Sequence, residues 1–220
     1  MELLQFGHAG LPVVVFPTSG GRFYEFEDHG MVAACAERVE AGQVQFFCVD
    51  SVDAESWYNQ GAPPRERIVR HCQYEEYILR EVLPLVRGRN QDPRLLALGC
   101  SFGGYHAMNI ALRHPDLFTG VLAMSGTFDL TGFLSGYYDQ DCFQNLPTHY
   151  LRAQTDPWFL ERYQQNHYTL ATGWDDQCLQ QNQALDRVLS ARNISHQLHI
   201  WESQNAHDWP TWQRQIREYL

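Results

Sequence analysis

Residues 94–113 read RLLALGCSFGGYHAMNIALR and contain the turn that decides the fold. The apolar run 94–99 predicts a buried strand, and the stretch from about Phe102 to Arg113 predicts a helix. Between them, GCSFG at 99–103 matches G-x-S-x-G, a pattern in which a sharp strand-to-helix turn exposes a serine hydroxyl. The sequence therefore predicts Ser101 as a nucleophile at the tip of a strand. The alternative is a small-residue turn without chemistry.

On both sides of this turn, apolar runs alternate with stretches of helical spacing. Further strands are expected at 11–16, 44–49, 120–126, 167–173 and 196–202. Further helices are expected at about 24–41, 63–88, 178–193 and 209–220. Continuous apolar strands alternating with helices predict an α/β fold with a mostly parallel central sheet and helices on both faces, a three-layer sandwich.

The length of 220 residues predicts a single domain spanning 1–220. One segment, 128–165, breaks the strand-helix alternation and is rich in aromatic and turn residues. A connection of this length is usually functional, so we expect a small lid-like insertion that covers a pocket. The alternative is a helical excursion that only packs on the surface.

Composition excludes several classes of function. The chain carries 16 Lys plus Arg against 26 Asp plus Glu, a net charge of −10, so nucleic-acid binding is not expected. All 16 cations are Arg, which excludes Schiff-base chemistry, a pyridoxal-phosphate anchor and a Walker P-loop lysine. No H-E-x-x-H motif or Cys/His cluster is present, so neither a metal nor another cofactor is expected.

The N-terminus MELLQFGHAGLP lacks the features of a signal peptide, and no run approaches 18 apolar residues. The six cysteines include no C-x-x-C pair, and several lie in apolar runs typical of small buried side chains. These features predict a cytoplasmic protein with free thiols and no membrane contact.

A serine hydroxyl needs a base to take its proton, and the base needs an acid to orient it. His207 lies in the loop between the last strand and the last helix, where a base belongs when the order is Ser, acid, His. Asp175 and Asp176 follow the strand 167–173, and Asp129 follows the preceding strand; residue type and position leave all three open. Four other histidines near the turn or the last strand are expected to pack instead: His106, His114, His196 and His199.

The charge on a reacting carbonyl oxygen needs backbone N–H donors. Phe102, the residue after the nucleophile, is expected to supply one. The second belongs to the loop after strand 11–16, and because Pro17 has no N–H, Thr18 or Ser19 must donate. The alternative for Ser19 and the two glycines after it is a plain tight turn.

The strings GCSFGG (99–104), HPDLF (114–118) and HDWPTW (207–212) resemble the putative esterase family of the α/β-hydrolase fold. The family includes S-formylglutathione hydrolases, enterochelin esterases, feruloyl esterases and mycolyltransferases, and the resemblance extends from about Pro12 to the C-terminus. It implies Ser101 as nucleophile, His207 as base and Asp176, three residues after Gly173, as acid. Asn205-Ala206 and Pro17-Thr18 depart from the glycine-containing sequences that many members carry at these places.

We therefore expect a serine carboxylesterase that hydrolyses small acyl esters through an acyl-Ser101 intermediate. Acyl transfer by the same triad, or a non-enzymatic binding protein on this fold, are the alternatives. A substrate pocket is expected to involve Trp57, Tyr137 and Tyr138, with Tyr58 and Phe133 as neighbours. The expected partner is a small-molecule ester, and the aromatic content is compatible with a homodimer.

Overall fold

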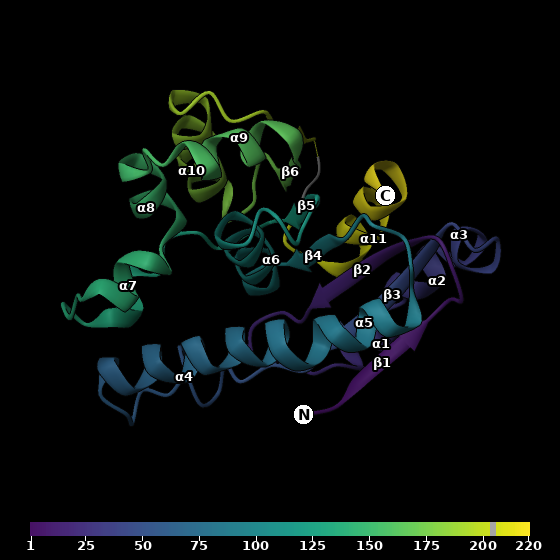
Figure 1. Cartoon of the computed structure of the whole chain (residues 1–220), viewed down its shortest axis with the longest axis horizontal. Coiled ribbons are helices and arrows are strands. Elements are labelled where there is room, and N and C mark those ends of the chain that lie inside the picture. Colours follow the sequence, from purple (N-terminus) through teal and green to yellow (C-terminus); the bar gives the residue numbers. More distant parts are fainter. Residues whose placement is uncertain (203–205) are drawn as a thin grey trace.

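The computed structural model describes residues 1–202 and 206–220 and is built around a seven-stranded sheet (Figure 1). The strand order is β1-β3-β2-β4-β5-β6-β7, and every neighbouring pair is parallel except β1 with β3. This arrangement confirms the predicted α/β fold with a mostly parallel sheet. The strands are β1 (Leu3–Phe6), β2 (Leu11–Phe16), β3 (Val44–Val49), β4 (Leu96–Cys100), β5 (Gly120–Met124), β6 (His167–Gly173) and β7 (His196–Trp201).

Both faces of the central strands are buried, which explains their continuous apolar sequences. In β2, Val13 and Val15 belong to one hydrophobic cluster, whereas Val14 and Phe16 belong to the cluster on the other face. The same alternation runs through β3, β4 and β5, as expected where successive side chains point to opposite faces.

The helices form a layer on each face of the sheet. One layer contains α1 (Glu25–Asp28), α2 (Met31–Ala34), α3 (Ala36–Glu40) and α11 (Trp209–Tyr219). The other contains α4 (Pro64–Tyr77), the π-helix η1 (Ile78–Val82), α5 (Leu83–Arg89), α6 (Phe102–Arg113) and α10 (Leu179–Ala191). Among the described residues, no helix is both long and apolar enough to cross a membrane.

Three local features differ from the expectations. The helix expected at 24–41 is divided into α1, α2 and α3, because Gly30 adopts a left-handed φ of 71° between the first two. The helix expected at 63–88 contains the π-helix η1, in which the Leu83 N–H donates to the Ile78 carbonyl five residues earlier. The next residue, Pro84, has no N–H, so one backbone donor is missing at this point of the helix. Strand β1 was not expected, since its four half-buried residues form only an edge.

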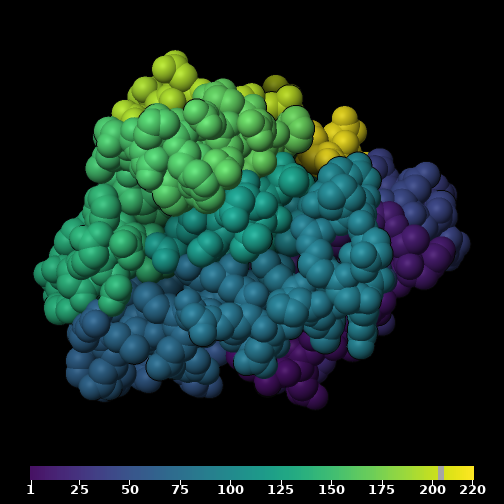
Figure 2. All heavy atoms as spheres, viewed as in Figure 1, coloured from purple at the N-terminus to yellow at the C-terminus, as the bar shows by residue number. Residues whose placement is uncertain are grey.

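The segment 128–165 contains the 3₁₀-helix η2 (Thr131–Leu134), α7 (Gln140–Gln144), α8 (Pro147–Ala153) and α9 (Pro157–Gln165). Figure 2 shows them as a continuous green surface beside the blue surface of α4. A cavity of about 350 Å³ lies between α7, α8, α9 and the carboxyl end of α6. Because α6 rises about 1.5 Å per residue, this cavity is on the order of 15 Å from Ser101, which precedes the amino end of α6.

Candidate active site

The sheet topology brings three side chains together from distant parts of the sequence. Ser101 follows β4, Asp176 follows β6, and His207 follows β7. Because β4, β6 and β7 are parallel strands of one sheet, their carboxyl ends lie at the same edge. The site is therefore assembled where the chain leaves the sheet.

Ser101 adopts φ 54° and ψ −119°, a strained conformation for a residue with a side chain. Two flanking glycines make the turn possible. A Cβ on Gly99 would lie 2.2 Å from the Gly103 carbonyl group, and a Cβ on Gly103 would lie 2.3 Å from the Phe16 carbonyl oxygen. The Ser101 N–H donates to the Met124 carbonyl at 2.8 Å, which ties the turn to β5.

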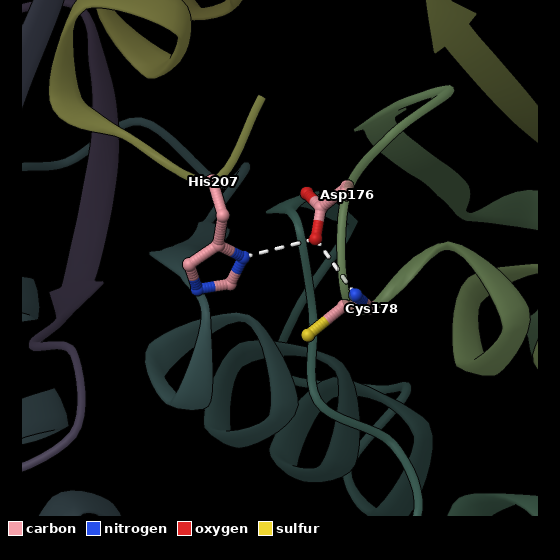
Figure 3. A group of neighbouring side chains, drawn as sticks. All are labelled: Asp176, Cys178 and His207. Atoms are coloured by element: carbon pink, nitrogen blue, oxygen red, sulfur yellow. Dashed lines mark hydrogen bonds and ion pairs between the residues drawn. The ribbon is translucent and has the colours of Figure 1, made fainter. Parts of the chain in front are cut away.

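His207 contacts both partners that a proton relay requires. Its Nε2 lies 2.9 Å from Ser101 Oγ, and its Nδ1 lies 3.0 Å from Asp176 Oδ1 (Figure 3 shows the second contact). Asp175 Oδ1 instead accepts from the Ala206 N–H at 3.3 Å, and Asp129 Oδ1 accepts from Thr131. Of the three carboxylates that residue type and position left open, Asp176, the one that the family resemblance implied, is thus the one in contact with His207.

His207 is held in this position by the close packing of the preceding residue, Ala206, against Gly173 at the end of β6. A Cβ on Gly173 would lie 1.8 Å from the Ala206 Cβ, so the loop approaches β6 only because residue 173 is glycine. On its other side, the His207 ring packs edge-on against Trp212 at 5.1 Å. Ser203, Gln204 and Asn205, which were expected in the same loop, lie outside the described residues.

The pKa values of Asp176 and His207 shift in opposite directions. Burial opposes ionisation of Asp176, but hydrogen bonds from His207 and the Cys178 N–H outweigh it and lower the pKa of this carboxyl. Burial likewise opposes the imidazolium, but the Asp176 contact, together with Cys178, outweighs it and raises the pKa of His207 above its ordinary value. Asp176 is therefore a carboxylate that stabilises a protonated His207.

The four other histidines have structural partners, as expected. His106 is buried and contacts Asp53 at 2.9 Å, and His114 contacts Glu75 at 2.8 Å. His196 contacts Asp186 at 3.0 Å, and His199 stacks on Tyr219 at 4.4 Å between ring centroids.

The loop after β2 distinguishes the two candidate oxyanion donors. The Thr18 N–H is already taken by Oε1 of Glu25, and the Thr18 hydroxyl donates to Oε2 of the same carboxylate at 3.1 Å. For the described part of the chain, no protein acceptor is recorded for the N–H of Ser19 or of Phe102. The expectation that Thr18 could donate to an oxyanion is therefore corrected, and Ser19 and Phe102 keep available donors.

The aromatic residues expected around the site divide into two groups. Trp57 is only 1% exposed and packs against His71 and Tyr105, so it offers no surface to a substrate. Its neighbour Tyr58 is 38% exposed, and its ring lies 5.1 Å from that of Phe102. The Tyr58 hydroxyl lies 2.7 Å from Ser19 Oγ, so this side chain joins the two loops with available N–H groups.

The segment 128–165 reaches this area through Phe133, whose ring lies 5.0 Å from that of Tyr58. Tyr137 and Tyr138 bond within the segment instead, to Asp139 at 2.6 Å and to His149 at 2.7 Å. From the sequence we expected all these aromatic residues near a pocket. Residue type and spacing did not show that, of the adjacent Trp57 and Tyr58, Tyr58 is the exposed one.

One group within the described ranges 1–202 and 206–220 brings three metal-ligating side chains together. The ligand atoms of Asp176, Cys178 and His207 lie within 4.8 Å of one another (Figure 3). Asp176 Oδ1 is already engaged by His207 and by the Cys178 N–H, at 3.0 Å and 2.7 Å. A metal ion would compete for the same oxygen and imidazole that Ser101 requires, so this group fits a proton relay better than a resident metal.

Comparisons with known proteins agree with this architecture. A family model described as "Putative esterase" matches residues 8–220. A solved ferulic acid esterase is 17% identical, with 96% of this chain and 84% of that chain covered at a TM-score of 0.72. An S-formylglutathione hydrolase from Agrobacterium tumefaciens is 16% identical, with 99% and 86% covered at a TM-score of 0.74.

A ferric enterobactin esterase from Salmonella typhimurium is 19% identical, with 98% of this chain but 52% of that chain covered at a TM-score of 0.62. At these identities the solved structures establish the shared fold. The search of curated proteins found no match.

Proposed function

The chain belongs to the putative esterase family and is a carboxylic ester hydrolase; we propose that it cleaves small acyl esters through an acyl-Ser101 intermediate. The observation that carries the proposal is the continuous chain of contacts from Ser101 Oγ through His207 to Asp176, at 2.9 and 3.0 Å. A serine, a base and an orienting acid in this geometry are what nucleophilic ester cleavage requires.

In the first half of the reaction, Ser101 Oγ attacks the ester carbonyl carbon while His207 Nε2 takes the hydroxyl proton. The tetrahedral intermediate then collapses as the bond to the alcohol oxygen breaks, and His207 donates its proton to that oxygen. In the second half, water attacks the acyl carbon and His207 accepts a proton from the water. The second tetrahedral intermediate collapses as the bond between the acyl carbon and Ser101 Oγ breaks, His207 returns its proton to Oγ, and the carboxylic acid leaves. Asp176 stabilises the imidazolium in both halves.

The negative oxygen of each tetrahedral intermediate needs donors that are not already bonded. We assign this role to the N–H groups of Phe102 and Ser19. Phe102 begins α6, a helix of 12 residues, so its N–H lies at the positive end of the helix dipole. The contact of Tyr58 with both residues supports the assignment, because it holds the two loops beside each other.

The exposed aromatic surface suggests where the ester lies. Tyr58 and Phe133 form an edge-to-face pair beside Phe102, and we propose that this pair contacts the acyl or alcohol group of the substrate. Ser101 is 9% exposed, which favours a small ester over a bulky one. The cavity at the carboxyl end of α6 lies too far from Ser101 to hold the reacting group.

The test is covalent labelling with a fluorophosphonate probe, followed by mapping of the modified peptide. We expect stoichiometric labelling at Ser101 in the wild-type protein and none in Ser101→Ala. A panel of aryl and alkyl esters of increasing acyl length then measures kcat/KM, which we expect to fall as the acyl chain grows. Absence of labelling in a folded wild-type protein, or labelling at another residue, would overturn the proposal.

A further inference from the structure

Glu25 lies outside the triad, yet its side chain reaches back seven residues to the oxyanion loop. One carboxylate oxygen accepts the Thr18 N–H, and the other accepts the Thr18 hydroxyl at 3.1 Å. Both oxygens therefore bind a single residue, one through its backbone and one through its side chain. Charge-assisted bonds of this kind are stronger and more directional than neutral ones.

The loop is closely packed on both sides of this contact. A Cβ on Gly21 would lie 2.0 Å from Glu25 Oε2, so the carboxylate occupies the space that a side chain at position 21 would need. On the other side, a Cβ on Gly103 would lie 2.6 Å from the Pro17 carbonyl oxygen. The peptide before Thr18 is thus held between the Glu25 carboxylate and the first turn of α6.

Helix α1, which carries Glu25, is itself anchored in the core and against the helix that follows His207. Phe26 is 4% exposed and packs against Phe46 at 5.3 Å. His29, which directly follows α1, stacks on Trp209 at 4.3 Å with the two rings 8° apart. Glu25 therefore has a fixed base from which to orient the loop.

We propose that Glu25 is a positioning residue for the oxyanion hole, an inference that rests on the proposed function of Ser101. By holding both donors of Thr18, the carboxylate orients the peptides that follow Pro17 and leaves the Ser19 N–H as the donor for the substrate. Glu25 has no recorded contact with Ser101 or His207 among the described residues, so it acts through the loop and takes no part in proton transfer.

The first test compares Glu25→Ala with Glu25→Gln. We expect Glu25→Ala to lower kcat for a small aryl ester about 10- to 100-fold with little change in KM, because a displaced oxyanion donor weakens transition-state binding selectively. Glu25→Gln should recover most of this loss, since its amide oxygen still accepts the Thr18 N–H. The matched control is Glu27→Ala, which removes an exposed carboxylate from the same helix and should leave kcat unchanged.

A second variant tests the same contact without deleting Glu25. Gly21→Ala should push the carboxylate away from Thr18 and produce a similar loss in kcat. Because both changes break one contact, the double variant Gly21→Ala/Glu25→Ala should be no slower than the slower single variant. Multiplied losses would show that the two residues act independently and would overturn the proposal.

The experiments distinguish a wrong role for Glu25 from a wrong assignment of Ser101 as the nucleophile. If wild-type Ser101 is labelled by a fluorophosphonate but Glu25→Ala reacts at the wild-type rate, the positioning role is refuted and the esterase mechanism stands. The role is equally refuted if Glu25→Gln is as slow as Glu25→Ala while both retain the wild-type melting temperature. If wild-type Ser101 is not labelled at all, the mechanism itself fails.

Discussion

At the scale of single residues, Ser101 combines a side chain in contact with His207 with an unfavourable backbone conformation. Its φ of 54° is held by the N–H bond to Met124 and by the close approach of Gly99 to Gly103. Strain of this kind persists only where the surrounding structure determines it, and it commonly marks a functional turn. The backbone geometry of Ser101 is held by contacts of its neighbours, so we expect the hydroxyl itself to be dispensable for folding.

This separation predicts the behaviour of Ser101→Ala. We expect kcat to fall about 10³-fold or more, because the nucleophile is lost while binding is kept. The free energy of unfolding should change by less than about 0.5 kcal/mol, since no core volume is removed. Ester hydrolysis and chemical denaturation measure the two effects; an active Ser101→Ala enzyme would exclude this serine as nucleophile.

The triad also predicts a pH dependence. His207 must be neutral to accept a proton, so activity falls as the pH drops through its pKa. Because Asp176 and Cys178 raise that pKa above its ordinary value near 6.5, the acidic limb of kcat/KM should lie above pH 6.5.

Replacing Asp176 with Asn should lower kcat and move the acidic limb toward lower pH, because the charge that stabilises the imidazolium is removed. Asp175→Asn is the matched control on the adjacent residue and should leave the limb in place. Profiles of kcat/KM for the three proteins between pH 5 and 10 make the comparison. If Asp176→Asn leaves the pH of the acidic limb unchanged, the limb reports the titration of a group other than His207.

At the scale of elements, Glu75 joins α4 to the end of α6. Its carboxylate accepts two bonds from Arg113 Nε, at 3.0 and 2.9 Å, and contacts His114 Nε2 at 2.8 Å. Burial opposes ionisation, but the His114 and Arg113 contacts outweigh it and lower the pKa of Glu75 to about 2. A carboxyl with a lowered folded-state pKa stabilises the fold above its unfolded pKa near 4.3 and loses that effect as the pH falls toward 2.

We therefore expect Glu75→Gln to destabilise the protein by about 3 kcal/mol at neutral pH, since Arg113 loses its buried partner. The difference in melting temperature from wild type should shrink as the pH falls from 5 to 2. Glu76→Gln, at an exposed pair with Arg80, is the control and should change little at any pH. If the difference in melting temperature between wild type and Glu75→Gln stays constant with pH, the stabilising effect of Glu75 does not depend on its ionisation.

At the scale of the whole molecule, one sheet joins the first strand to the last, and hydrophobic clusters cover both of its faces. The segment 128–165 contributes Leu134, Cys142, Leu151 and Tyr163 to the larger cluster, together with residues of α4 and α6. Side chains of the segment are thus part of the same core as the sheet.

This shared core predicts that residues 1–220 unfold as one domain. Differential scanning calorimetry should show a single transition whose calorimetric and van't Hoff enthalpies agree. A Phe133→Ala variant, which alters the segment near Tyr58, should shift that transition without splitting it. A separate low-temperature transition, or early proteolysis confined to 128–165, would show that the segment is an independent unit.

Much of this architecture could be predicted because it depends on local pattern. The strands at 11–16 and 44–49 and the helix at 102–113 occur as expected, since strands buried on both faces and a glycine-flanked turn leave clear signals in sequence. The order Ser101, Asp176, His207 follows from the order of the strands. The edge strand β1 and the interruptions in 24–41 and 63–88 escaped prediction, because short edges and single-turn irregularities have no periodic signature.

The sequence by itself determined which loops meet at the carboxyl edge of the sheet, because strand and helix spacing are local properties. Residue type and position left open which of two adjacent residues faces the site; the family resemblance implied Asp176, and the tertiary structure distinguished the members of each pair. Asp176 rather than Asp175 contacts His207, Ser19 rather than Thr18 keeps an available N–H, and Tyr58 rather than Trp57 is exposed. Neighbouring residues in a loop point in different directions, and the choice between them depends on long-range contacts, such as Glu25 on Thr18 and Ala206 on Gly173, that no local pattern encodes.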